Sequence, residues 1–152
     1  MTTGEKIASV VPAGAKLTPA ETDAIVEIAY VTIAADRRLD PAEVEAFHAV
    51  LERLRGEPVD AIEVNQVLDQ MYVRIERAGD GLDDHLRALG AKMSVPAREL
   101  AYKIASAMSV ADLDASDEEF ELDLQLVEAL DLSSDRAEEL QAEVMAVLNP
   151  PE

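Results

Sequence analysis

The chain has no cysteine and no tryptophan, and only 3% of its residues are aromatic. Without cysteine it can form no disulfide framework, no thiolate metal site and no cysteine nucleophile. The predicted core is therefore aliphatic, and aliphatic side chains are abundant because 49% of the residues are hydrophobic. A chain of 152 residues fits one domain and can bury enough surface to fold without covalent cross-links.

Long apolar runs and a positively charged leader are also missing. No stretch approaches the roughly 18 uninterrupted apolar residues of a membrane-spanning helix. The first residues lack the charged and hydrophobic regions that define a secretory signal. These two absences predict a cytoplasmic protein without a membrane span.

Basic residues are scarce, with 13 lysines and arginines against 32 acidic residues and a net charge of −19. A surface of this charge repels the phosphates of nucleic acids and of anionic membranes. It attracts divalent cations and proteins with basic surfaces. We therefore expect no nucleic-acid binding.

Helical periodicity covers most of the chain, and no segment has the alternating pattern of a strand. Helix-start signals recur, because a capping side chain precedes most of the predicted helices. These caps are Thr18, Asp40, Asp60, Ser94, Ser116 and either Ser133 or Ser134. The sequence predicts an all-α bundle of six to seven helices over residues 18–148, with a flexible N-terminal arm at residues 1–17 and a tail at residues 149–152.

Two stretches, Ile28–Glu43 and Ile104–Glu119, are similar when Ile28 is aligned with Ile104. We call this the repeat alignment. Each stretch contains an apolar helix, an acidic turn and the capped start of a second helix. The repeat alignment predicts two pseudo-repeated helix–turn–helix units.

The acidic turns are the strongest candidates for chemistry, because hard cations prefer several carboxylate oxygens on a short segment. Helix capping also explains most of these acids. Asp36 and Asp112 are less well explained, because an acid at the C-terminal end of a helix faces the negative end of the helix dipole. An EF-hand is rejected, since Asp117 stands where that loop requires glycine. The candidate ligands for Ca²⁺ or Mg²⁺ are Asp36, Asp40, Glu43, Asp112, Asp114 and Glu119.

The two turns, AADRRLDPAE and VADLDASDEE, resemble the repeated motif of the tellurite-resistance protein B (TerB-like) family. The motif is Ala-Asp-Gly, an aliphatic residue two positions on, then Ser or Asp, and Glu three positions later. Arg37 and Leu113 stand where the family usually has glycine. The matching residues are Asp36, Leu39, Asp40 and Glu43 in the first turn, and Asp112, Ala115, Ser116 and Glu119 in the second. The resemblance covers about residues 18–148 and implies an all-helical fold with an acidic patch, a link to tellurite resistance or general stress response, and no defining enzymatic reaction.

No nucleophile and base stand in a catalytic arrangement, and His48 and His85 are predicted to lie on solvated helix faces. The leading hypothesis is a non-enzymatic module that recruits a protein partner with a basic or apolar surface. The alternative is a divalent-metal-binding protein that uses the acidic turns. The sequence specifies no other cofactor and no oligomeric state.

Overall fold

The computed structural model describes residues 3–11, 17–34, 41–111 and 124–148. These residues form helices and no strand, which confirms the predicted all-α class. The helices are α1 (Thr3–Ala8), α2 (Pro19–Ala34), α3 (Pro41–Arg55), α4 (Ala61–Ala78), α5 (Leu82–Ala91), α6 (Val95–Ala111) and α8 (Ser134–Leu148), with a short 3-10 helix η1 (Gly79–Gly81) between α4 and α5. Residues 124–129 are also helical. Among the described helices, none is both long and apolar enough to span a bilayer.

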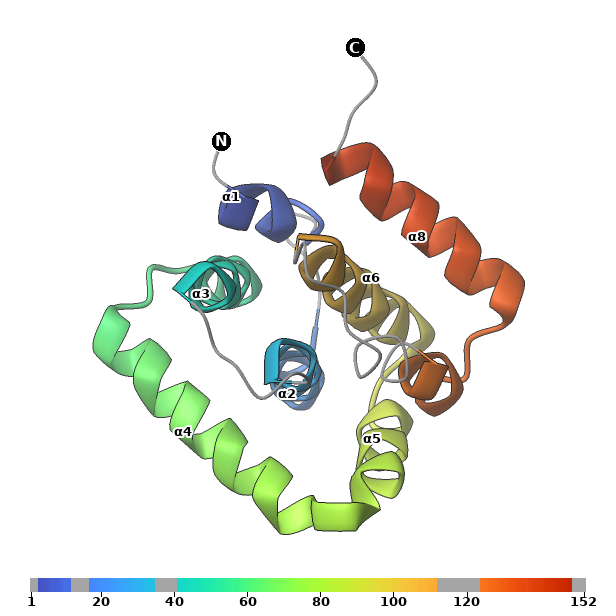
Figure 1. Cartoon of the computed structure of the whole chain (residues 1–152), viewed down its shortest axis with the longest axis horizontal. Helices are drawn as coiled ribbons and strands as arrows, with labels where there is room; N and C mark the ends of the chain where they lie inside the picture. The colour runs from blue at the N-terminus through green and yellow to red at the C-terminus, as the bar shows by residue number, and fades with distance from the viewer. Residues whose placement is uncertain (1–2, 12–16, 35–40, 112–123, 149–152) are drawn as a thin grey trace.

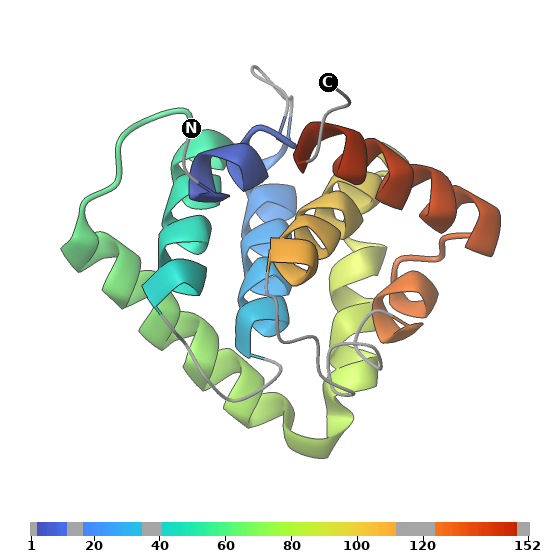
Figure 2. The same ribbon diagram turned by 45° about the horizontal axis from the view of Figure 1, so that its top comes forward.

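Helices α2 and α6 pack on each other in the middle of the molecule, with the other helices arranged around them (Figures 1 and 2). Nearly every residue is buried over residues 24–33 of α2 and residues 100–108 of α6, as expected for helix segments with no solvent-facing stripe. Small side chains let the two backbones approach closely. Ala29, Ala101 and Ala105 are all almost fully buried.

The starts of the two central helices are joined by one side chain, Glu21. The predicted capping box is confirmed, because Thr18 Oγ1 accepts from the Glu21 N–H at 3.1 Å and Glu21 Oε1 accepts from the Thr18 N–H at 3.0 Å. The second carboxylate oxygen, Oε2, accepts from the backbone N–H of Ser94 at 2.8 Å, at the start of α6. The hydrogen bonds from Ser94 and then Thr18 lower the pKa of Glu21 from 4.5 to about 2. One carboxylate thus serves two helix N-termini.

The N-terminal segment differs from the predicted flexible arm. Within it, α1 packs on α3 and α6, and Ile7 and Val11 are each only 1% exposed. Arg53 Nε also donates to the carbonyl oxygen of Val11 at 3.0 Å. The prediction is corrected for residues 3–11, where a pattern too short to show periodicity still buries apolar area. The predicted tail, residues 149–152, lies outside the described residues.

The positions of the helices agree with the repeat alignment. It places Pro19, the first residue of α2, on Val95, the first residue of α6, and α8 packs on α6 as α4 packs on α2. Helix α5 lies against the helical residues 124–129, where Gly90 is essential to the close approach. A Cβ atom at Gly90 would lie 2.5 Å from the carbonyl oxygen of Ala129.

Candidate functional site

The predicted metal ligands fall mainly on parts of the chain that the structure does not describe. Asp36, Asp40, Asp112, Asp114 and Glu119 lie outside the described residues. Glu43 lies in the first turn of α3 and is partly buried. Within residues 3–11, 17–34, 41–111 and 124–148, no three acidic or histidine side chains are grouped so that they could hold a metal ion. The metal site stays a prediction.

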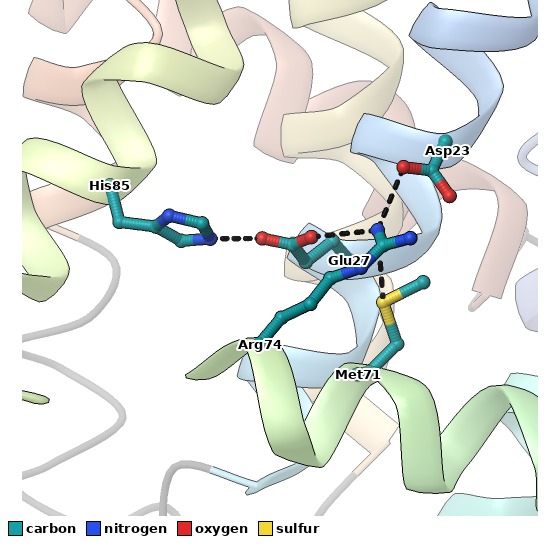
Figure 3. Close-up of polar contacts among 5 residues, drawn as sticks. All are labelled: Asp23, Glu27, Met71, Arg74 and His85. Atoms are coloured by element: carbon teal, nitrogen blue, oxygen red, sulfur yellow. Dashed lines mark hydrogen bonds and ion pairs between the residues drawn. The ribbon is translucent and has the colours of Figure 1, made fainter. Parts of the chain in front are cut away.

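A charged cluster that the sequence did not indicate lies between α2, α4 and α5. Its members are Asp23 and Glu27 on α2, Arg74 on α4 and His85 on α5, here called the Glu27 cluster. Glu27 is only 2% exposed. Burying a carboxylate is costly unless it is paired and hydrogen-bonded, and Figure 3 shows Glu27 held between a guanidinium and an imidazole.

Arg74 joins the two carboxylates of α2. Its Nη1 donates to Asp23 Oδ2 at 2.7 Å and to Glu27 Oε1 at 3.0 Å. The same nitrogen lies 3.9 Å from the sulfur of Met71. The hydrogen bond to Asp23, and then the one to Glu27, raise the pKa of Arg74. The guanidinium therefore fixes the C-terminal part of α4 on α2.

His85 completes the cluster from α5, and its predicted position on a solvated face is wrong. Its Nε2 contacts Glu27 Oε2. Because an ionised carboxylate can only accept, Nε2 is the donor in this contact. The imidazole is thus held in one orientation by α2. The cluster contains no hydroxyl or amine nucleophile, and its clear role is to tie α4 and α5 to α2.

An open groove of about 410 Å³ lies beside this cluster, between α2, α3 and α4. We call it the α2/α4 groove. Its volume falls within the roughly 300–1,000 Å³ of typical ligand sites. Val26, Val67 and Met71 contribute an apolar floor, and Asp23 and Glu57 contribute carboxylates. Asp23 and Met71 belong to this groove and also contact Arg74.

The equivalent position in the second unit, between α6 and α8, is closed by charged side chains. Arg136 binds Glu99 with two hydrogen bonds, at 2.7 Å and 2.9 Å. Lys103 pairs with Glu143 at 3.1 Å. These contacts leave a hollow of only about 140 Å³. The Arg136 hydrogen bonds lower the pKa of Glu99, and they raise that of Arg136 itself.

One signal in the sequence could have located the cluster. Glu27 is the only charged residue between Ala24 and Ala35. A single acid inside such an apolar helix is expected to be buried and to need a cationic partner. The identity of that partner has no local signal, because Arg74 and His85 are 47 and 58 residues away.

Comparison with known proteins gives no match for this chain among family models, curated proteins or solved structures.

Proposed function

We propose that this chain is a non-enzymatic interaction module that recruits a protein partner through α4. The observation that supports the proposal is the outer face of α4. Ile62 is 72% exposed, Tyr72 is 55% exposed and Val73 is 45% exposed. Ile62 and Val73 are about three helical turns apart and share one side of the helix. Exposed apolar residues gathered on one element are typical of an interaction surface.

The charge around this face favours a basic partner over a second copy of the chain. Asp69 and Glu76 are exposed on α4 near Tyr72, and the whole chain carries a net charge of −19. Two such chains repel each other at low salt. A partner with apolar side chains flanked by lysine or arginine is complementary to the face. The TerB-like resemblance adds the proposal that this recruitment serves a stress or tellurite-resistance response.

Site-specific photo-crosslinking tests the proposal. A photoreactive phenylalanine analogue replaces Tyr72 in one variant and Met145, which is 40% exposed on α8, in the control variant. We expect a discrete cross-linked protein from cells of the native host with the Tyr72 variant and not with the Met145 variant. The yield should fall with added salt, because the attraction between exposed charges is screened. Equal cross-linking from both positions, or none from Tyr72, would refute the α4 surface.

A further inference from the structure

We propose that the α2/α4 groove binds an arginine side chain of the partner protein. The inference rests on the proposed function, because it names the chemistry by which the recruited partner is anchored. It commits to one occupant, a guanidinium on a flexible apolar stem.

The floor of the groove suits the stem of that side chain. Val26 and Met71 come from α2 and α4, and Leu54 comes from the end of α3. All three side chains are apolar, so the methylene groups of an arginine can pack on them while its charged end stays near the rim. Charged residues, Asp23, Arg55 and Glu57, also line the groove, so it suits a side chain with an apolar stem and a charged end.

The unpaired charge at the rim is negative. Arg55 also lines the groove, but it already pairs with Glu63 at 2.8 Å. Arg74, beside the groove, is held by Asp23 and Glu27. Glu57 is exposed on the link between α3 and α4, and no ion pair within the described part of the chain engages it. An incoming guanidinium therefore finds a carboxylate that no cation has neutralised, and a charge-assisted bidentate contact is available.

The second unit of the chain shows how the corresponding space between its helices α6 and α8 is filled. In the repeat alignment, Asp23 corresponds to Glu99, and Arg136 of α8 binds Glu99 with two hydrogen bonds. The same alignment places Asp60 at the position of Arg136. Asp60 cannot supply a guanidinium, and its side chain instead caps α4 by accepting from the Glu63 N–H at 2.8 Å. In the first unit the acid that corresponds to Glu99, Asp23, is instead bound by Arg74 of α4 at 2.7 Å, so the carboxylate that remains for an arginine of the partner is Glu57.

Two short acetylated peptides that differ at one position test the inference. Each has leucines around a central residue, which is arginine in one peptide and its neutral isostere citrulline in the other. Binding is followed in the full chain by NMR of labelled methionine methyl groups. Met71 lines the groove, whereas the exposed Met145 on α8 reports non-specific attraction to the acidic surface.

We expect the arginine peptide to shift the Met71 signal and leave the Met145 signal in place. The citrulline peptide should bind about tenfold more weakly, the size of the loss of one charged hydrogen bond. Glu57→Gln should weaken the arginine peptide about fivefold or more by the same reasoning. Glu138→Gln removes an exposed charge on α8 and should leave the affinity unchanged.

Any of four results would overturn the inference. These are no binding, equal affinity for the two peptides, an equal effect of the two Gln variants, and equal shifts of the Met71 and Met145 signals. The two variants change exposed side chains, so each should remain folded, which the methionine spectrum itself reports. The proposed function is tested separately by cross-linking at Tyr72. If a partner is captured at Tyr72 but the groove does not bind the arginine peptide, the proposed α4 surface is supported and only the arginine site in the groove is refuted.

Discussion

Replacing Arg74 by methionine removes the cation that lies between Asp23 and Glu27. The replacement keeps an unbranched side chain on α4 and leaves Glu27, which is 2% exposed, with His85 as its remaining partner in the cluster. Two hydrogen bonds are lost, at 2.7 Å to Asp23 and 3.0 Å to Glu27. We expect the free energy of unfolding to decrease by about 2–3 kcal/mol, somewhat less than the roughly 3–5 kcal/mol for breaking a fully buried ion pair.

The two lost contacts differ in weight. Asp23 has a half-exposed side chain, and exposed pairs contribute less than about 1 kcal/mol. The larger part of the loss comes from Glu27, because its charge stays buried with one fewer donor. The expected loss of stability is smaller than for a fully buried ion pair, because the Arg74 side chain is itself 39% exposed and because His85 still donates to Glu27.

Urea denaturation followed by circular dichroism measures this loss, and a double-mutant cycle with Glu27→Gln assigns it. If Arg74 acts on Glu27, the two changes are non-additive, with a coupling of about 1–2 kcal/mol. Arg87→Met is the matched control, since Arg87 pairs with Glu128 through side chains that are 54% and 68% exposed. It should change stability by no more than about 0.5 kcal/mol. Equal losses at Arg74 and Arg87, or additive effects of Arg74 and Glu27, would refute the reasoning.

Two further predictions concern the shared cap and the acidic turns. The pKa of Glu21 is lowered from 4.5 to about 2 in the folded chain. The stability that its carboxylate contributes is therefore fully present above pH 4.5 and is lost as the pH falls from 4.5 to about 2. Glu21→Gln should lower the melting temperature at neutral pH, and the melting temperatures of the variant and the native chain should converge as the pH falls. A difference between the two that stays the same at every pH would contradict this sign. The metal hypothesis predicts that Ca²⁺ or Mg²⁺ raises the melting temperature of the chelated native chain but not that of Asp36→Asn/Asp112→Asn. A calorimetric titration without heat would remove that hypothesis.

Helix starts could be predicted because their signals are local. Asp60 accepts from the backbone N–H three residues later, and Ser133 does the same from Arg136, which decides between the two predicted serines. Capping depends on residues within one turn, so a single sequence contains the whole interaction. The all-α class follows from the same local patterns and is confirmed.

The partners of Glu27 in the Glu27 cluster could not be predicted because they meet it only in the folded chain. Polar surroundings in the sequence, next to Asp83 and Asp84, favoured a solvated His85. Its contact with Glu27 joins residues 58 positions apart, and no helical periodicity encodes that distance. The short segment that includes α1 was missed for a related reason, since Ile7 and Val11 are buried by α3 and α6 rather than by their own neighbours.

Because the Glu21 carboxylate accepts hydrogen bonds at the starts of both α2 and α6, the second unit depends on a side chain of the first. In the repeat alignment, the position of Glu21 in the second unit is held by Ala97, which is fully buried. The second unit can still use Ser94 Oγ for the Ala97 N–H at 3.4 Å, but the Ser94 N–H depends on an acid from the other half of the chain. A fragment that began after α4 would start its central helix without that carboxylate, and water would have to accept from the Ser94 N–H. We therefore expect the two units to fold cooperatively, because the first half supplies a hydrogen-bond acceptor that the second half lacks.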